Sequence, residues 1–330
     1  MARDATRPID VLTLGEAMVL FVATEPGALS EVTCFRRATA GAEFNVAIGL
    51  ARLGLRVSFL TRVGGDAFGR HVQQVLQREG IAADLVQQDA AHRTGFMLKA
   101  LAPTGQDPAI EYHRRGSAAS HLGLPDLPAT LLPQTRHVHL TGIAAGVSPS
   151  LRELVFELAR QARAQGCTLS FDPNLRPALW PSPREMIDTL MPLAALCDWI
   201  LPGQAEGERL TGRTRPEAIA DAFLAQGARG VVVKQGGEGA WFHDARTGQR
   251  GHLPAQSVAH VVDTVGAGDG FAVGVISALL EGLDLGAATA RGHAIGARVL
   301  QFPGDCDGLP TRDELSAFLS SSRQPQGACP

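Results

Sequence analysis

The sequence predicts a single α/β domain in which helices cover both faces of a mostly parallel central sheet, with a small β lid beside the sheet. Three observations support this prediction. Short apolar segments alternate with helical patterns, the 330 residues are 45% hydrophobic and 19% charged, and neither an internal repeat nor a long linker divides the chain. Strands that alternate with helices are typical of parallel βαβ units, whose sheet is buried between two layers of helices.

The predicted strands are short apolar segments, some of which end at glycine. They are residues 11–14, 56–63, 137–140, 168–171, 199–201 and 230–233. Apolar residues at helical spacing fill much of the remaining chain. These predicted helices are residues 43–53, 151–164, 184–196, 266–280, 286–300 and 312–319.

Two segments, about 19–39 and about 94–120, interrupt this alternation. The second contains MLKAL and IEYHRR, which have the pattern of exposed strands rather than helices. We expect the two segments to form the lid, within one domain that spans residues 1–330. The last eleven residues, 320–330, read SSSRQPQGACP and are predicted to be a disordered tail.

The composition narrows the possible partners and the cellular location. A formal net charge of −3 gives no reason to expect nucleic acid or a membrane as a partner. The five cysteines include no CxxC pair and no histidine spacing that completes a zinc site, which favours a reducing cytoplasm. The N-terminal residues show no signal-peptide pattern, and no run of about 18 apolar residues occurs. We also expect a homo-oligomer.

The segment DTVGAGDGF, residues 263–271, is the most informative one for chemistry. The small residues at 266–268 allow successive backbone N–H groups to point at one spot where a helix begins, and such a turn attracts an anion. Asp269 lies in the first turn, where the helix N-terminus favours its carboxylate form and so its ability to accept a proton from a hydroxyl. From these residues alone, a glycine-rich turn whose aspartate only caps the helix is an equally good interpretation.

DTVGAGDGF resembles the C-terminal signature of the ribokinase-like (PfkB) carbohydrate kinases. AGAEFNVA at residues 40–47, followed by Gly54 and Gly64, resembles the N-terminal signature of the same family. The resemblance implies a ribokinase-like three-layer fold and phosphoryl transfer from ATP with Mg²⁺. It also implies that Asp269 is the catalytic base. The anion hole for the transferred group would be Gly266, Ala267 and Gly268.

Further segments are similar to one branch of this family, the kinases of 2-keto-3-deoxygluconate. They are GEAMVLF at 15–21, EYHRRGSAAS at 111–120, SFDPNLRPALW at 170–180, LPGQAEGERLTG at 201–212 and GDCDGLPTRDEL at 304–315. This similarity implies phosphorylation of the 6-hydroxyl of the sugar acid to give 2-keto-3-deoxy-6-phosphogluconate. Kinases of 2-keto-3-deoxygalactonate or 5-keto-2-deoxygluconate remain alternatives, as does a non-catalytic sugar-acid sensor, although a pure binder needs no base.

Arginines in these segments suit an acidic sugar, because a guanidinium group can bind a carboxylate through two hydrogen bonds. Arg176 follows the predicted strand 168–171, where open α/β sheets bind ligands, with a surface ion pair as the alternative. Tyr112 and Arg114 are two residues apart on a predicted lid strand and so share a face. We expect both to face the substrate, with Arg115 as the alternative near the phosphates.

The N-terminal signature supplies two more substrate candidates. Gly41 permits close approach of the backbone, and the Asn45 amide can both donate to and accept from sugar oxygens. A hydrogen bond within its own helical turn is the alternative for Asn45. The resemblance also implies a substrate contact for Asp305, with Asp307 as a nearby alternative.

The remaining candidates concern the nucleotide and the metal. Lys234, Gly236 and Gly239, in KQGGEG, resemble the KxGxxG nucleotide loop of the family. Glu206 matches the last residue of its NxxE motif, in which Gly203 replaces the asparagine, and implies a magnesium contact through water.

Other enzyme classes lack their motifs in this chain. The sequence contains no GxxxxGK[ST], no GxSxG and no GxGxxG followed by an acidic residue about 20 positions later, which disfavours P-loop kinases, α/β-hydrolases and Rossmann dehydrogenases. His137 and His139 alternate on a predicted strand. With no third ligand in sight, strand packing is the better interpretation of this pair.

Overall fold

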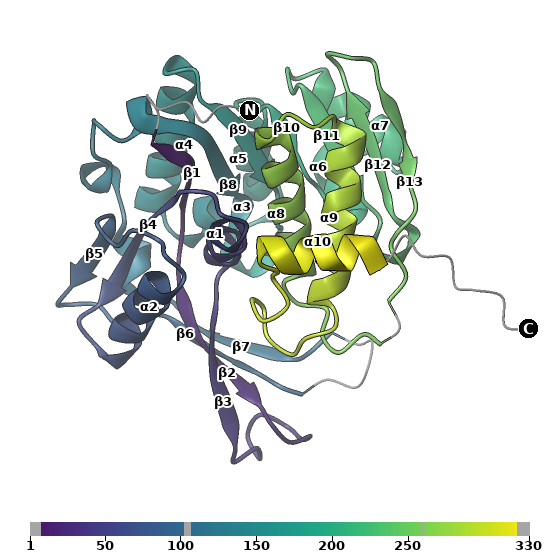
Figure 1. The fold of residues 1–330 in the computed structure, drawn as a ribbon. Coiled ribbons are helices and arrows are strands. Elements are labelled where there is room, and N and C mark those ends of the chain that lie inside the picture. Colours follow the sequence, from purple (N-terminus) through teal and green to yellow (C-terminus); the bar gives the residue numbers. More distant parts are fainter. Residues whose placement is uncertain (1–7, 102–106, 259, 322–330) are drawn as a thin grey trace, which may run out of the picture.

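A nine-stranded sheet forms the centre of the molecule in the computed structural model, which describes residues 8–101, 107–258 and 260–321 (Figure 1). Along the sheet the strands follow the order β13-β12-β11-β10-β9-β8-β1-β4-β5. From β5 to β11 neighbouring strands are parallel, and β12 and β13 add an antiparallel edge. Their bounds are β1 Ile9–Leu14, β4 Val57–Gly64, β5 Val86–Asp89, β8 Thr135–Thr141, β9 Thr168–Asp172, β10 Trp199–Ile200, β11 Gly230–Lys234, β12 Ala240–Asp244 and β13 Arg250–Leu253.

Helices cover both faces of this sheet, each over its own hydrophobic core (Figure 1). The first core packs side chains of α4 Pro149–Ala164, α5 Pro183–Ala194, α6 Gln204–Thr211 and α7 Pro216–Leu224, and α3 Gly142–Val147 lies on the same side. The second core packs side chains of α1 Ala42–Arg52, α2 Ala67–Arg78, α8 Ala267–Leu280, α9 Leu285–Val299 and α10 Arg312–Ser321. The predicted three-layer α/β architecture is confirmed.

Short 3₁₀ helices occur in the connections. They are η1 Ala118–His121, η2 Leu124–Asp126, η3 Leu132–Gln134, η4 Pro177–Leu179 and η5 Gly236–Glu238. The predicted disordered tail lies outside the described residues except for Ser320 and Ser321, which continue α10. None of the described helices is long and apolar enough to cross a lipid bilayer. The cysteines described by the structure, Cys34, Cys167, Cys197 and Cys306, are free thiols.

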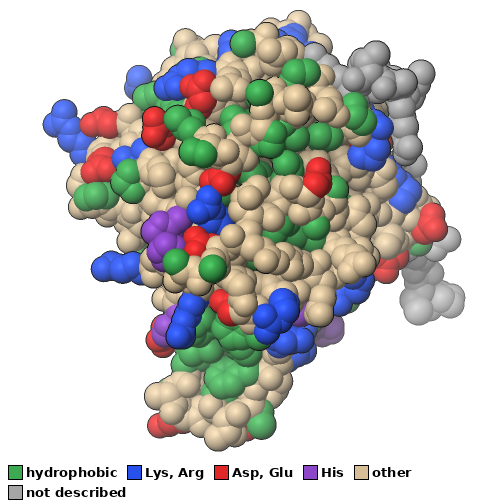
Figure 2. All heavy atoms as spheres, turned by 90° about the vertical axis from the view of Figure 1, so that its left-hand side faces the viewer, with side chains coloured by type: hydrophobic (Ala, Val, Ile, Leu, Met, Phe, Trp, Pro, Cys, Tyr) green, Lys and Arg blue, Asp and Glu red, His purple; other side chains and the backbone are tan. Residues whose placement is uncertain are grey.

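A second, four-stranded sheet of order β3-β2-β6-β7 lies below the main body in Figure 1. Its strands are β2 Met18–Ala23, β3 Phe35–Ala40, β6 Phe96–Lys99 and β7 Ile110–His113, so it is built from the two segments that interrupt the βαβ alternation. We call it the small sheet. One side carries a small apolar cluster around Leu20 and Met97, and Phe21 and Phe96 make ring contacts with Phe68 of α2. Hydrophobic side chains gather at this end of the molecule in Figure 2.

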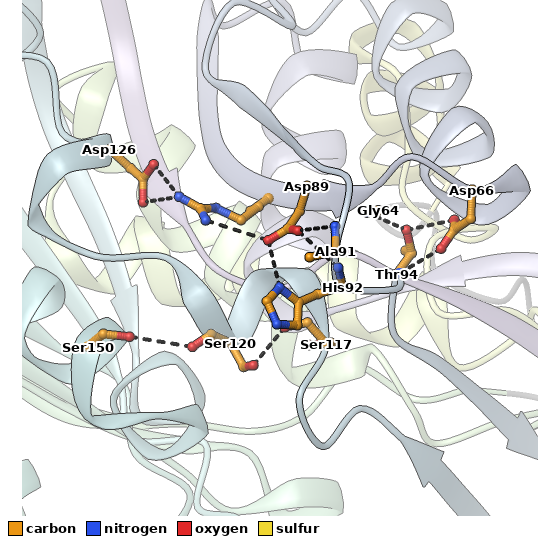
Figure 3. A network of polar contacts seen from close by, with 11 residues as sticks. Gly64, Asp66, Asp89, Ala91, His92, Thr94, Ser117, Ser120, Asp126 and Ser150 are labelled. Atoms are coloured by element: carbon orange, nitrogen blue, oxygen red, sulfur yellow. Dashed lines mark hydrogen bonds and ion pairs between the residues drawn. The ribbon is translucent and has the colours of Figure 1, made fainter.

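A network of polar contacts fixes the chain where it enters β6 (Figure 3). The Asp66 carboxylate accepts from the Thr94 N–H at 2.9 Å and from the Gly69 N–H at 2.7 Å at the start of α2. Thr94 Oγ1 in turn accepts from the Gly64 N–H at 2.9 Å. These contacts connect the residues that precede β6 with the carboxyl end of β4 and with the beginning of α2.

The predicted strands differ from the observed ones mainly at the edges of the main sheet. Each strand predicted for the main sheet is present within about two residues of its expected bounds. The hairpin β12–β13 was not predicted, because its second strand, RGHL, is short and polar and does not show the alternation of a half-buried strand. MLKAL was expected to be an exposed strand, which is wrong for its first and third residues: Met97 and Lys99 of β6 are buried.

Candidate active site

A cleft of about 870 Å³ lies between the carboxyl ends of the parallel strands and the small sheet. The main body contributes residues that follow β1, β8 and β9 and the last residue of β11, and the small sheet contributes residues of β2, β3, β6 and β7. Open α/β sheets bind their ligands at this edge, because the loops that leave the strands diverge there.

The cleft brings together most of the residues that the sequence singled out. The predicted residues that line it are Gly41, Asn45, Tyr112, Arg114, Arg176, Glu206, Lys234, Gly266, Gly268, Asp269 and Asp305, together with the alternative Arg115. Three predicted residues are not among the lining residues. Ala267 is the first residue of α8, and Gly236 and Gly239 lie in the turn after β11.

Gly266 makes the sharp turn that starts α8 and places Asp269 in the first helical turn. Its φ of 84° lies in the left-handed region, and a Cβ at this position would lie 2.5 Å from the carbonyl oxygen of Asp305. Only glycine fits such a position without strain. The turn therefore packs directly on the loop that carries Asp305, and both surfaces face the cleft.

Asp269 is half-buried and lines the cleft, and its surroundings change its acidity. Burial raises the pKa of its carboxyl group to about 7, and the negative charges of Asp172 and Asp305 add to this increase. A hydrogen bond from Asn45 and the positive charge of Arg176 oppose it only in part. The helix N-terminus favours the carboxylate form of this group, but desolvation outweighs the helix dipole and the net pKa is raised. A group with a pKa near 7 is well matched to accept a proton at neutral pH.

A chain of hydrogen bonds orients this carboxylate. Asn45 Nδ2 donates to Asp269 Oδ2 at 2.7 Å, and Asn45 Oδ1 accepts from Cys306 Sγ at 2.8 Å. Arg52 Nη1 donates to the Cys306 carbonyl at 2.8 Å and so supports the same loop. Asn45 was expected to contact the sugar or its own helical turn, whereas here its amide is engaged with Asp269. Cys306 was not predicted as a site residue. Its position between the two candidate aspartates in GDCDG was the sequence feature that could have indicated it.

Asp305 is also paired, with a lysine that the sequence analysis did not select. Lys99 Nζ donates to Asp305 Oδ1 at 2.8 Å and to Asp263 Oδ2 at 2.6 Å, and its side chain is 1% exposed. Burial opposes the charged form of this lysine, but the two carboxylates together raise its pKa. Because Lys99 ends β6 and its partners flank the α8 turn, this cluster joins the small sheet to the candidate catalytic turn.

The three candidates from the segment around β7 differ in their surroundings. The Arg114 guanidinium forms an ion pair with the buried Glu16, with its Nη2 at 2.6 Å from Oε2. Arg115 is exposed and has no ion-pair partner among the described residues. Tyr112 is 44% exposed. All three line the cleft, but the charge of Arg114 is already neutralised.

Arg176 follows β9 and carries a charge that no described carboxylate pairs with. Its Nη1 donates to the neighbouring carbonyl of Leu175 at 3.0 Å. The guanidinium lies close enough to Asp269 to lower the pKa of that carboxyl group. The alternative of a surface ion pair is therefore not realised among the described residues, and the charge of Arg176 remains available to a ligand in the cleft.

Lys234, Asp172 and Glu206 form a charged cluster at the ends of β9 and β11. Lys234 Nζ donates to Asp172 Oδ2 at 2.6 Å. The two Glu206 oxygens accept from the Leu175 and Gly203 N–H groups, each at 2.7 Å. Burial, and then the charge of Asp172, raise the pKa of Glu206. Asp172 was not singled out in the sequence, although it directly follows the predicted strand 168–171 and is the last residue of β9.

This cluster fits a nucleotide phosphate chain with Mg²⁺. Carboxylate oxygens are ligands that Mg²⁺ accepts, and the ion usually keeps several waters and binds through one or two carboxylates and substrate phosphates. The described residues contain no group of three or more His, Cys, Asp or Glu side chains that could hold a metal ion by themselves. Lys234 Nζ lies 3.8 Å from the position of a Cβ on Gly268, so a cation stands beside the N-terminus of α8, where an anion is favoured.

The histidine pair on β8 has a structural explanation. His137 Nδ1 lies 2.8 Å from Thr168 Oγ1, and His139 Nδ1 lies 2.9 Å from Ser170 Oγ on the neighbouring strand β9. Burial lowers the pKa of each ring to about 3. The prediction of strand packing is confirmed for this pair.

Comparison with known proteins agrees with this geometry. Residues 9–312 match the sequence profile of the pfkB family carbohydrate kinases. The chain is 46% identical over 317 residues to a 2-dehydro-3-deoxygluconokinase of Bacillus subtilis, with 96% of this chain and 97% of that protein covered. Its fold is similar to that of a PfkB protein from Polaromonas sp. JS666, with a TM-score of 0.86 and 47% identity over 94% of this chain and 99% of that one.

It is also similar to an aminoimidazole riboside kinase from Salmonella enterica, solved with aminoimidazole riboside and an ATP analogue. That match has a TM-score of 0.80 and 26% identity, over 94% of this chain and 99% of the other. The family profile covers nearly the whole chain, including both glycine-rich signatures and the loop that carries Asp305. The chain therefore belongs to the pfkB family of carbohydrate kinases.

Proposed function

We propose that this protein transfers the terminal phosphoryl group of ATP to the 6-hydroxyl of 2-keto-3-deoxygluconate. The observation that carries the proposal is a cleft that combines a half-buried carboxylate of pKa about 7 with Arg176, an arginine that no described carboxylate pairs with. The 46% identity to a 2-dehydro-3-deoxygluconokinase supports the same substrate. A neutral sugar would leave the charge of Arg176 without a partner, which disfavours it.

At the acidic end of the substrate, Arg176 binds the carboxylate and Tyr112 contributes a hydroxyl group. Arg114 lines the same region, but its ion pair with Glu16 makes it a weaker source of charge. Gly41 lines the cleft and offers its backbone to a sugar hydroxyl; its φ of 130° and the 2.3 Å between a Cβ there and the Glu16 carbonyl oxygen restrict this position to glycine. Asp305 keeps one oxygen free of Lys99 and can accept from a hydroxyl.

At the reacting end, Asp269 accepts the proton of the 6-hydroxyl as that oxygen bonds to phosphorus and the bond to the leaving ADP breaks. The backbone N–H groups of Gly266, Ala267 and Gly268 stabilise negative charge on the transferred group. When bound, Mg²⁺ neutralises part of the phosphate charge, and Asp172 and Glu206 would hold it through direct or water-mediated contacts. Most of the rate enhancement in phosphoryl transfer comes from such positioning and charge stabilisation.

On the nucleotide side, Lys234 contacts the phosphates, and the turn with Gly236 and Gly239 borders the rest of the nucleotide. Both glycines have positive φ, 59° and 116°, and leave a side of the turn free of side chains. We place the reaction in the cytoplasm, where ATP is available and where the free cysteines of the chain stay reduced.

A coupled ADP-release assay across a panel of sugars tests the substrate. We expect the highest kcat/KM with 2-keto-3-deoxygluconate, lower values with 2-keto-3-deoxygalactonate and 5-keto-2-deoxygluconate, and little turnover with ribose or fructose. A neutral sugar that outperforms all three acids would overturn the assignment. If none of the acids stimulates ATP consumption, the result would support the non-catalytic sensor instead.

A variant of Arg176 tests the binding mode. Arg176→Ala should raise KM for the acid by roughly 10- to 100-fold, because a charge-assisted contact is lost, and should leave KM for ATP nearly unchanged. Arg184→Ala is the matched control, because Arg184 is 91% exposed and pairs with Asp188 within α5. An equal rise of both KM values would show that Arg176 serves the phosphates or the fold.

A further inference from the structure

A second pocket lies behind the active site, between the small sheet and the main body. Its cavity volume is about 170 Å³, and β3, α1, α2 and the loop after α9 each contribute to its lining. Figure 1 shows these elements meeting where the small sheet joins the body, and Figure 2 shows basic side chains just above the small sheet. The charged lining residues are Arg36, Arg37, Arg52, His71, Arg78, Glu79 and Asp307.

Some of these charges neutralise one another. Arg52 binds Glu79 through two contacts, Nε to Oε2 at 2.8 Å and Nη2 to Oε1 at 2.9 Å. Arg36 Nη2 pairs with Asp307 Oδ2 at 2.9 Å. Because the four arginines of the pocket face only two carboxylates, two positive charges remain.

The two remaining charges belong to Arg37 and Arg78. Arg37 has no acidic partner among the described residues, and Arg78 Nε is 3.9 Å from a Glu79 oxygen that Arg52 already engages. His71 lines the same pocket: burial lowers its pKa, and the nearby charges of Arg37 and Arg78 lower it further. Three cationic or ionisable groups therefore face one space, which an anion would fill favourably.

These charged groups lie on two different parts of the molecule, so an anion bound between them would connect the two parts. Arg37 is on β3 of the small sheet, whereas His71 and Arg78 are on α2 of the main body. Without an anion their charges repel one another across the junction; an anion between them converts repulsion into attraction. We propose that this pocket binds a small phosphate-type dianion, free phosphate or a phosphate monoester, which clamps the small sheet to α2.

The pocket shares a wall with the active site. On the pocket side, Arg36 pairs with Asp307 and Arg52 donates to the Cys306 carbonyl. On the cleft side of the same loop, Cys306 Sγ donates to Asn45 and Asp305 pairs with Lys99. Anion binding is thus communicated to the cleft both through this loop and through the small sheet.

Proton NMR of the His71 ring tests the site without any turnover, so the result does not depend on the proposed substrate. The chain is titrated with pH in sodium phosphate and in sodium chloride at equal ionic strength, and His71→Gln identifies the resonance. We expect phosphate to raise the pKa of His71 by roughly 1 unit, since an opposite charge nearby favours the protonated ring. Glycerol phosphate serves as the monoester probe, and the probe that acts at lower concentration identifies the source of the dianion.

Variants and hydrogen exchange complete the test. Arg37→Ala and Arg78→Ala should each abolish most of the phosphate-dependent shift, and Arg160→Ala, a change in an exposed α4 residue paired with Glu157, should leave it intact. In phosphate the backbone amides of β3 should also exchange more slowly in the wild-type chain. The proposal is overturned if His71 titrates identically in phosphate, glycerol phosphate and chloride, or if the exchange of β3 does not respond.

Discussion

At the scale of single residues, the surroundings of Asp269 disfavour its charged form and so give it a pKa suited to accepting a proton near neutral pH. Its pKa of about 7 results from burial and from two neighbouring carboxylates, so near neutral pH a large fraction of the group is protonated in the free protein. As a base it must be ionised. We therefore expect kcat/KM to rise with pH through about 7 and then to level off.

Asp269→Asn tests this role directly. The amide keeps the size of the side chain, and its Oδ1 can still accept from Asn45, but it cannot take up a proton. We expect kcat to fall by roughly 10²- to 10⁴-fold, with KM for both substrates close to wild type and with the pH dependence near 7 removed. A kcat close to that of the wild-type enzyme would refute the assignment of the base.

Cys306 acts on the same carboxylate through Asn45 and is a positioning residue. The hydrogen bond from Asn45 lowers the pKa of Asp269 against the effect of burial, and the Cys306 thiol holds the amide in the orientation that makes this bond. Cys306→Ala should therefore move the acidic limb of the pH–rate profile upward by roughly 0.5–1 unit, whereas Cys306→Ser, which retains a donor, should stay near wild type.

The matched control is Cys197→Ala, which removes a buried thiol that donates to the Leu193 carbonyl on the other side of the sheet. If Cys306 only fills space, both alanine variants will lower the melting temperature and leave the pH profile in place. That result would rule out a positioning role.

At the scale of elements, the small sheet is fixed at one end and joined at the other to the residues that flank the turn before α8. The contacts of Thr94 with Asp66 and Gly64 hold the entry to β6 against the main body (Figure 3). Lys99, at the other end of β6, pairs with Asp263 and Asp305 beside the α8 turn. We propose that the small sheet serves as a lid whose motion has its hinge near Thr94.

Hydrogen exchange on the free, ATP-bound and acid-bound protein measures this motion. We expect the amides of β6 and β7 to exchange more slowly when the acid is bound, while the amide of Thr94 remains protected in all three states. Because closure excludes water, ATP hydrolysis without the acid should be far slower than phosphoryl transfer. Equal protection of β7 with and without the acid, or a background ATPase that rivals the kinase rate, would contradict the lid assignment.

At the scale of the whole molecule, local patterns predicted the fold and the motif residues, and long-range packing set their partners. The apolar strands of the main sheet are visible in the sequence because burial on both faces requires continuous apolar runs. The partners of Lys99 are not visible, since Asp263 and Asp305 are 164 and 206 residues away. Asn45 and Cys306 are 261 residues apart. Such pairs depend on how two layers pack, and no local pattern specifies that.

The same packing determines the pKa of a carboxyl group, which a sequence motif alone does not reveal. The sequence places Asp269 at a helix N-terminus, which by itself favours the carboxylate. The assembled fold adds the buried Asp172 from β9 and the buried Asp305 from the loop after α9 beside the half-buried Asp269. The direction of the pKa shift is therefore a property of the folded molecule and not of the motif.

This burial also predicts how the stability of the whole molecule depends on pH. The carboxyl group of Asp269 titrates at about 7 in the folded chain instead of 3.8, so the unfolded chain releases this proton first as pH rises. The free energy of unfolding therefore decreases as the pH rises from about 4 to about 7.

The variant Asp269→Asn tests this prediction. Its side chain cannot ionise, so its free energy of unfolding does not decrease for this reason. The apo variant should match the wild-type chain near pH 4 and be more stable by roughly 1–4 kcal/mol above pH 7 in urea denaturation. His137 and His139 titrate alike in both chains and cancel in the difference. A stability difference that does not change across this range would mean that Asp269 is ionised at little cost in the folded protein, which would contradict its buried environment.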